Sequence, residues 1–253
     1  MKKILKDKLT VEIYDTRAEM GVAAGAMAAQ KIRECLAEKD EVNVIFAAAP
    51  SQNEMLASLM SHKDISWERV NAFHMDEYIG LSADAPQGFG NFLRAHIFDH
   101  LPFKSVNYIN CEATDIDAEC ARYMALLREK PVDVVLLGIG ENGHIAFNDP
   151  HVADFHDNVT VKAVSLDEVC RQQQVNDGCF ASLELVPQHA LTLTIPALTA
   201  ARHMVCTVPA ATKAWAVKET VNGEIGEHCP ATIMRLHESA VMYCDSDSGS
   251  GLL

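Results

Sequence analysis

The segment Asp133–Pro150, with the sequence DVVLLGIGENGHIAFNDP, decides the fold of this chain. Its first part, Val134–Leu137, is an uninterrupted apolar run, which is typical of a strand buried on both faces of a parallel sheet. Residues able to form hydrogen bonds or exchange protons follow soon afterwards: Glu141, His144, Asn148 and Asp149. In open α/β sheets ligands bind beyond the carboxyl ends of the strands. The segment therefore predicts a polar ligand site at a strand end.

Two other interpretations of the same segment stay open. The sequence GIGENG has the G-x-G-x-x-G spacing of a dinucleotide-binding fingerprint, but no helix-forming stretch follows it. Asn142-Gly143 could also form a plain hairpin turn between two strands. A hairpin would leave the polar cluster without an explanation, so a site at the strand end is the preferred hypothesis.

Composition and charge restrict the possible functions. The chain has 253 residues, of which 49 % are hydrophobic, and a formal net charge of −14. Its length suits one large α/β domain, its apolar runs are too short to cross a membrane, and its start lacks the apolar core of a signal peptide. An acidic surface repels nucleic acid and anionic membranes, so we expect a cytoplasmic protein with neither partner. An anionic substrate would need a local lysine or arginine.

The cysteines and histidines indicate neither disulfides nor a metal. The eight cysteines are dispersed without a CxxC pair, and most lie in apolar strand-like runs. This distribution favours reduced core cysteines in a cytosolic protein over a disulfide framework or a zinc site. The eleven histidines show no HExxH or paired-ligand spacing, so no bound metal is expected.

Strand-like and helix-like segments alternate along nearly the whole chain. The predicted strands are 11–14, 41–49, 70–75, 106–109, 133–138, 160–164, 190–195, 204–208 and 240–244. The predicted helices are 17–38, 54–60, 88–101, one capped by Asp115 or Asp117, 212–221 and 230–237, and the stretch 167–180 is expected to be irregular. The alternation predicts a mostly parallel sheet with helices on both faces, and no linker divides residues 1–253, which we expect to form one domain.

Two further strand ends carry polar residues. The turn Ser51-Gln52-Asn53 lies between a strand and a helix, where backbone N–H groups can hold a phosphate, although a helix cap at Ser51 is an equally good explanation. Asp76 and Glu77 follow the strand 70–75. If these strand ends are neighbours, a carboxylate could abstract a carbon-bound proton and His144 could shuttle a proton to a ring oxygen. Solvated turn acids and a polar loop histidine are the plain alternatives.

Two motifs in the expected order carry a family resemblance. FHMDEYIGL around Asp76 and LLGIGENGHIAFNDP around His144 closely resemble the glucosamine-6-phosphate deaminase/isomerase family. The resemblance extends along most of the chain, through GNFLRAHIFDHL, VPQHALTLTIPAL and the Lys213 region. It implies a single Rossmann-like, three-layer αβα domain and a reaction that needs no metal or organic cofactor. The implied reaction converts an amino-sugar 6-phosphate to a ketose 6-phosphate and ammonia.

The resemblance also implies roles for individual residues. Asp76 matches the base that moves hydrogen from C2 to C1, and His144 matches the histidine that assists ring opening. Glu141 and Asp149 match the two acids that flank this histidine. Further expected contacts to the substrate or its phosphate are Ser51, Gln52, Asn53, Glu77, Gly143, Arg171 and Lys213.

Several departures from the family pattern affect these expectations. The acids at 141 and 149 are Glu and Asp where the family usually has Asp and Glu, and a displacement of about 1 Å at a catalytic group can cost on the order of a hundredfold in rate. The usual glycine-rich phosphate loop is replaced by AAAPSQNE, and Arg171 is only the nearest candidate for a usual arginine. The chain lacks the longer C-terminal extension of allosteric members, so we expect no amino-sugar allostery.

Three functions remain in competition. The preferred one is an amino-sugar-phosphate deaminase-isomerase, acting on glucosamine 6-phosphate or its galactosamine equivalent. The first alternative is a 6-phosphogluconolactonase-type hydrolase on the same fold, which needs no counterpart to Asp76. The second is a sugar-phosphate sensor that binds without turnover. The sequence does not decide between the two sugars, and it leaves a homo-oligomer possible.

Overall fold

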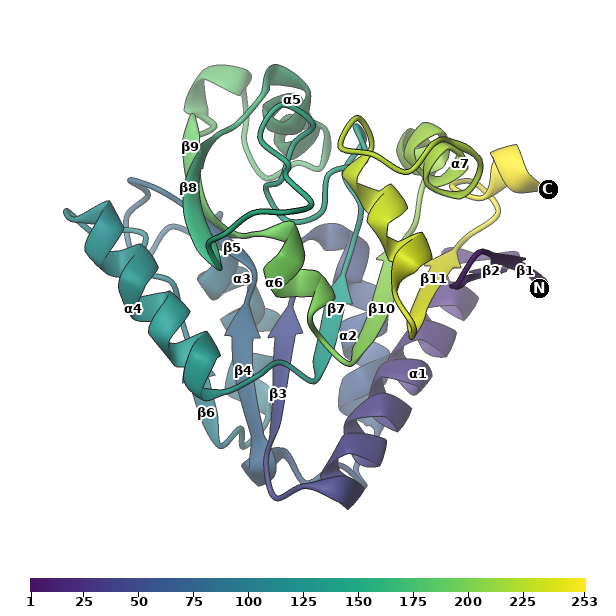
Figure 1. Ribbon diagram of the computed structural model, residues 1–253, viewed down its shortest axis with the longest axis horizontal. Coiled ribbons are helices and arrows are strands. Elements are labelled where there is room, and N and C mark those ends of the chain that lie inside the picture. The colour runs from purple at the N-terminus through teal and green to yellow at the C-terminus, as the bar shows by residue number, and fades with distance from the viewer.

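The computed structural model describes residues 1–253 and is built around an eight-stranded sheet (Figure 1). The order across the sheet is β1 (Lys2–Lys6), β2 (Leu9–Ile13), β11 (Ala240–Cys244), β10 (His203–Val208), β7 (Val134–Leu137), β3 (Val42–Phe46), β4 (Val70–His74) and β6 (Ser105–Asn107). All neighbours pair in parallel except β1 and β2, so the prediction of a mostly parallel sheet is confirmed.

Helices cover both faces of this sheet. They are α1 (Arg17–Glu38), α2 (Asn53–Ser61), α3 (Phe89–His96), α4 (Ile116–Glu129), α5 (Glu168–Asn176), α6 (Ile195–Thr199) and α7 (Ala214–Asn222). One apolar core packs the sheet against α1, α2 and α3, and a second packs it against α4, α6 and α7. Because successive side chains of a strand point to opposite faces, Val44 and Phe46 of β3 join the first core and Ile45 joins the second. In Figure 1, α1 and α4 lie on opposite sides of the strands.

A small antiparallel sheet lies beyond the carboxyl ends of the large one. Its strands are β5 (Asp76–Tyr78), β9 (His189–Leu193) and β8 (Val161–Ser165), with β9 in the middle. Only one residue, Met75, separates β4 from β5, so the chain passes directly from the large sheet into the small one. In Figure 1 the small sheet and α5 lie together above the strand ends. Asp76 is therefore at the junction of the two sheets.

The structure corrects several sequence predictions. The stretch 167–180 is not irregular throughout, because it contains α5, whose N-cap residue Asp167 accepts the N–H of Cys170 at 2.6 Å. β1 was not predicted, since Lys2, Lys3 and Lys6 obscure the alternation of its short sequence. The predicted helix 230–237 is the 3₁₀ helix η6 (Pro230–Leu236), and the predicted helix 88–101 divides into α3 and η3 (Phe98–His100). The other 3₁₀ turns are η1 (Pro50–Gln52), η2 (Trp67–Arg69), η4 (Leu183–Leu185), η5 (Ala211–Lys213) and η7 (Ser250–Leu252).

The two edges of the large sheet differ in how they are exposed. β1 pairs only with β2, and its residues Lys2, Lys3 and Leu5 are exposed. β6 at the opposite edge is only three residues long. All eight cysteines are free, five of them buried. None of the helices combines the length and the apolar character needed to cross a lipid bilayer.

Candidate active site

One pocket forms where the carboxyl ends of β3, β4 and β7 meet. Asp76, from the junction after β4, and His144, from the loop after β7, line this same pocket together with Ser51 and Gln52 of η1. The remaining wall is apolar or comes from α5 and the β7 loop: Ala47, Ala48, Ala49, Met75, Phe89, Gly138, Ile139, Gly140, Ala146, Phe147, Gln173 and Gln174. The acid and the imidazole, 68 positions apart in the sequence (144 − 76), thus face one shared space.

The loop after β7 is a compact turn and not one arm of a hairpin. Gly143 donates its N–H to the carbonyl of Gly140 at 3.0 Å, and Gly140 donates to the carbonyl of His144 at 2.9 Å. Gly143 has φ +82°, and a side chain there would collide with the sulfur of Cys229. A side chain at Gly140 would collide with the ring of His144. The glycines therefore let the chain fold back closely enough to present His144 to the pocket.

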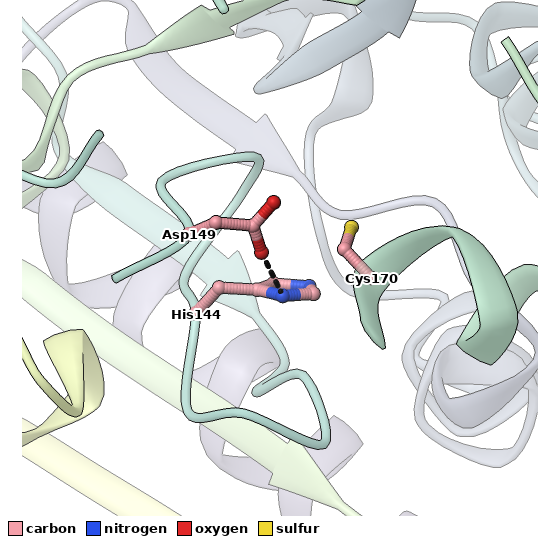
Figure 2. A group of neighbouring side chains, drawn as sticks. All are labelled: His144, Asp149 and Cys170. Carbon is pink, nitrogen blue, oxygen red and sulfur yellow. Dashed lines mark ion pairs between the residues drawn. The ribbon is translucent and has the colours of Figure 1, made fainter. Parts of the chain in front are cut away.

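His144 is paired with a fully buried carboxylate. Its Nδ1 lies 2.9 Å from Oδ1 of Asp149, which is 0 % exposed. The dashed line in Figure 2 marks this ion pair. Asn142 donates to Oδ1 at 2.9 Å, and the N–H of Asp167 donates to Oδ2 at 3.2 Å. Burial opposes ionisation of Asp149, but His144 and these two donors outweigh it and hold its pKa below the usual range. Asp149 is thus set up to stay ionised beside the imidazole.

Asp76 has the opposite electrostatic environment. It is 6 % exposed, and its carboxylate accepts no hydrogen bond. Burial, together with the like charge of Glu77, raises the pKa of Asp76 well above its usual value. Its backbone is held firmly, because the ring of His74 lies 2.9 Å from the Asp76 carbonyl through Nδ1 and accepts the N–H of Ile109 at 2.9 Å through Nε2. The site therefore offers a carboxylate of raised basicity at a fixed position.

The turn at 50–53 is not a simple helix cap. Ser51 caps neither η1 nor α2 with its side chain, so that alternative is not borne out. Gln52 is fully buried and donates through Nε2 to Ser51 Oγ at 3.1 Å and to the carbonyl of Thr207 at 3.2 Å. Its Oε1 and the Oδ1 of Asn53 are buried without a partner. The turn thus presents polar groups that the protein itself does not satisfy.

A buried lysine and a half-buried glutamate lie outside the pocket lining. Lys213, at the end of η5, is 4 % exposed, and its Nζ has no hydrogen-bond partner. Burial lowers the pKa of Lys213, and the charges of Asp177 and Glu141 partly offset this. Glu141 donates its N–H to Gln173 Oε1 at 2.9 Å, while its own Oε1 is buried and unpaired. An unpaired amine and an unpaired carboxylate oxygen are both costly unless a ligand completes them.

Two residues expected at the substrate are instead engaged by the protein. Glu77 accepts the N–H groups of Tyr78, Phe89 and Gly90 at 3.0, 3.0 and 2.9 Å, so its carboxylate anchors the start of α3. Arg171 donates through one guanidinium nitrogen to the carbonyls of Leu183 and Val186, at 2.7 and 3.0 Å. Neither residue lines the pocket. Both hold neighbouring segments in position, and a contact of either residue with the substrate stays a prediction.

Sequence reasoning missed two glutamines of the pocket. Gln173 and Gln174 are 6 % and 7 % exposed and come from α5, the helix that the sequence did not predict. Asp167 followed by Glu168 is an N-cap signal that could have revealed the helix. Recognising α5 would have placed Cys170, Gln173 and Gln174 on one face of a helix, which is the face that is buried.

Comparison with known proteins places the chain in a family. The sequence profile of the family described as glucosamine-6-phosphate isomerases/6-phosphogluconolactonase matches residues 15–243. The chain belongs to this family. A member from Listeria innocua named glucosamine-6-phosphate deaminase is 34 % identical over 227 residues, covering 90 % of this chain and 95 % of that one. A Bacillus cereus protein of the same name is 35 % identical over 240 residues, covering 95 % and 87 % of the two chains.

Solved structures of the family share the fold. A monomeric glucosamine-6-phosphate deaminase superposes with a TM-score of 0.85 at 28 % identity, covering 95 % of this chain and 99 % of that one. A 6-phosphogluconolactonase from Thermotoga maritima superposes with a TM-score of 0.75 at 19 % identity, covering 94 % of this chain and all of that one. The second likeness, at this low identity, concerns the fold alone. The predicted Rossmann-like αβα fold is confirmed.

Proposed function

We propose that this protein converts an amino-sugar 6-phosphate and water to a ketose 6-phosphate and ammonia. Glucosamine 6-phosphate is the first substrate to test, because the relatives that match along most of the chain are named glucosamine-6-phosphate deaminase. The observation that carries the proposal is the position of Asp76 and His144 in one pocket at the strand ends. Aldose–ketose conversion needs a base at carbon and a proton shuttle at oxygen, and these two groups can supply them.

Asp76 is assigned to the carbon-bound proton. In the open-chain substrate the C2 proton is acidified by the C1 carbonyl, and a carboxylate can remove it and return it to C1. The resulting C2 imine takes up water and releases ammonia, which leaves the ketose. A raised pKa makes the carboxylate a stronger base than an exposed aspartate, so burial of Asp76 favours this step.

His144 is assigned to ring opening. Opening the pyranose requires a proton to leave the C1 hydroxyl and one to reach the ring oxygen, and an imidazole can do both in turn. Asp149, held ionised next to Nδ1, orients the ring. Glu141, from the same loop, is assigned as the second acid that flanks the histidine.

The phosphate is assigned to the turn at 51–53 and to Lys213. A phosphate would accept from the Ser51 hydroxyl and the Asn53 side-chain NH₂, while Gln52 holds the turn through its Nε2. It would also give the buried, unpaired ammonium of Lys213 an opposite charge. Gly143 lets the loop after β7 pack closely against Cys229, where a side chain would collide with the sulfur. The acidic surface of the whole chain supports a cytoplasmic enzyme that uses neither nucleic acid nor membrane as a partner.

The alternative on this fold is a 6-phosphogluconolactonase. Lactone hydrolysis needs an activated water but no carbon-bound proton transfer, so it gives no reason for a buried aspartate of raised pKa in the pocket. Asp76 therefore favours the deaminase-isomerase.

The deciding experiment offers the purified protein three substrates in parallel: glucosamine 6-phosphate, galactosamine 6-phosphate and 6-phosphogluconolactone. Ammonia and acid release are followed separately. We expect ammonia from at least one amino sugar and no enzyme-dependent acid from the lactone. Acid from the lactone without ammonia from either sugar would replace the proposal by the hydrolase, and binding without any turnover would indicate a sensor.

A further inference from the structure

A cysteine lies beside the imidazole–carboxylate pair and has no part in the proposed reaction. Cys170 is in the first turn of α5 and is 1 % exposed. One donor atom each from His144, Asp149 and Cys170 lies within 4.8 Å of the other two, and Figure 2 shows the three side chains grouped together. We propose that these three residues form a binding site for a thiophilic divalent cation such as Zn²⁺. We also propose that the bound ion inhibits the enzyme.

The donor set suits such an ion in type, spacing and charge. Imidazole nitrogen, thiolate sulfur and carboxylate oxygen are the ligands that Zn²⁺ takes in tetrahedral sites, with donor atoms roughly 3.3–3.6 Å apart given its usual bond lengths. Separations within 4.8 Å need only small side-chain rotations to reach this spacing. One thiolate and one carboxylate carry two negative charges, which balance a divalent cation at a place where all three residues are buried.

Hydrogen bonds from neighbouring residues also hold Asp149 and Cys170 in position. Asn142 donates to Oδ1 of Asp149 at 2.9 Å and to Oδ2 of Asp167 at 3.1 Å. Asp167 in turn accepts the N–H of Cys170 at 2.6 Å and donates its own N–H to Asp149 at 3.2 Å. These bonds fix the carboxylate and the helix turn that carries the thiol relative to each other. Outer contacts of this kind orient ligands in metal sites.

The imidazole nitrogen that faces Asp149 could bind the ion in place of this contact. Nδ1 of His144 is buried and lies 2.9 Å from Asp149, but it forms no hydrogen bond of good geometry with any residue. A cation can take that position and displace the thiol proton of Cys170. Binding would occupy both His144 and Asp149, which removes the proton shuttle from the pocket. The inhibition, but not the binding, rests on the proposed function.

The test measures binding and inhibition separately. Cd²⁺ serves as the spectroscopic probe, because its bond to a thiolate produces ultraviolet absorption, and it is titrated into the substrate-free protein, Cys170→Ser, His144→Gln and Cys179→Ser. Cys179 is the matched control, since it follows the same helix, is partly exposed and lies outside the cluster. Zn²⁺ inhibition of ammonia release is then measured for the parent protein, Cys170→Ser and Cys179→Ser, each relative to its own uninhibited rate.

We expect Cys170→Ser to lose one thiolate-bound Cd²⁺ per chain and to need at least tenfold more Zn²⁺ for half inhibition. His144→Gln should weaken Cd²⁺ binding at least tenfold, and Cys179→Ser should behave as the parent in both assays. Unchanged Cd²⁺ absorption in Cys170→Ser would overturn the site. Loss of absorption with unchanged Zn²⁺ inhibition would overturn its inhibitory role. If no amino sugar releases ammonia, the proposed function fails while the Cd²⁺ titration still decides the site.

Discussion

Asp76 is the residue whose environment most directly predicts a chemical property. Replacing it by Asn keeps the shape of the side chain but removes the base, so turnover should fall by about 10²–10⁴-fold. Substrate binding should be nearly unchanged. Exchange of the C2 proton with solvent deuterium, followed by NMR, is the measurement. Asp99→Asn, at an exposed position, is the matched control. Continued exchange in Asp76→Asn would remove this residue from the reaction.

The same residue sets the acidic side of the pH profile. Asp76 can accept a proton only when ionised, and its pKa is raised by burial and by Glu77. We therefore expect kcat/KM to fall, on lowering the pH, at a pH well above the 3.8 of an ordinary aspartate. In Glu77→Gln the like charge is gone, so this fall should move to lower pH. A profile that does not respond to Glu77→Gln would assign the acidic limb to another group.

His144 belongs to a different step and should show it. His144→Gln removes the proton shuttle but leaves Asp76 in place, so turnover of the ring-closed sugar should fall by about 10²-fold or more. An analogue held in the open-chain form should be affected much less. Parallel kinetics on the two substrates make the comparison. Equal loss on both would argue against a role in ring opening.

At the scale of the element, Glu77 is part of the start of α3. Its carboxylate accepts three backbone N–H groups, and a glutamine can accept at only one of its two ends. Glu77→Gln should lower the free energy of unfolding by about 1–3 kcal/mol. Urea unfolding measures this, with the exposed Glu224→Gln as a control that should stay within about 0.5 kcal/mol of the parent. Full stability with weaker substrate binding would restore the substrate contact expected from the sequence.

The segment leading to Lys213 carries backbone strain. Ala210, just before η5, has φ +82° and ψ 148°, a region that favours glycine, and its N–H is held by Asp245 at 3.0 and 3.2 Å. Ala210→Gly should relieve this strain and raise the free energy of unfolding by about 1 kcal/mol. Ala211→Gly, in the exposed 3₁₀ turn that follows, should lower it. Thermal unfolding of both variants tests the pair, and equal destabilisation would show that no strain is present.

The sequence was most informative where one element has one clear pattern. The helix predicted over 17–38 is α1, because Thr16 and Glu19 form a capping box and a long Ala-rich stretch follows. The uninterrupted apolar sequence of β7 likewise located the strand end that His144 follows. The roles of Glu77 and Arg171 could not be predicted in this way. A glutamate or an arginine looks the same in a sequence whether its side chain binds the backbone or a ligand. α5 was missed because its polar composition hides the face that is buried.

For the whole molecule, His74 links stability to pH. Its Nε2 accepts a backbone N–H and its Nδ1 faces a carbonyl, so the buried ring is neutral with its proton on Nδ1. Burial lowers the pKa of His74 from 6.5 to about 4. As the pH falls, the imidazole of residue 74 is therefore protonated in the unfolded chain before it is protonated in the folded protein. The contribution of His74 to the free energy of unfolding is complete above pH 6.5 and is lost as the pH falls toward 4. The 2.5-unit difference (6.5 − 4) corresponds to about 3 kcal/mol.

This pH dependence can be assigned by substitution. His74→Asn should be less stable at neutral pH, and its free energy of unfolding should fall less steeply between pH 6.5 and 4 than that of the parent. His156→Asn, at an exposed position, should keep the parent's slope. Chemical denaturation at a series of pH values supplies both slopes. An unchanged slope in His74→Asn would show that other groups take up the protons.

The two edge strands of the large sheet, β1 and β6, restrict how copies of this protein can associate. An open strand normally offers a template for a neighbour's backbone, but a row of lysine ammonium groups at β1 would face the same row on a second copy. At the opposite edge, β6 has only three residues whose backbone could form hydrogen bonds with another strand, which is too few to hold an incoming strand. Continuous sheets through several molecules are thereby disfavoured, which protects the protein against fibre-like polymerisation at high concentration. Any assembly that does form must use helices or loops as its contact surface.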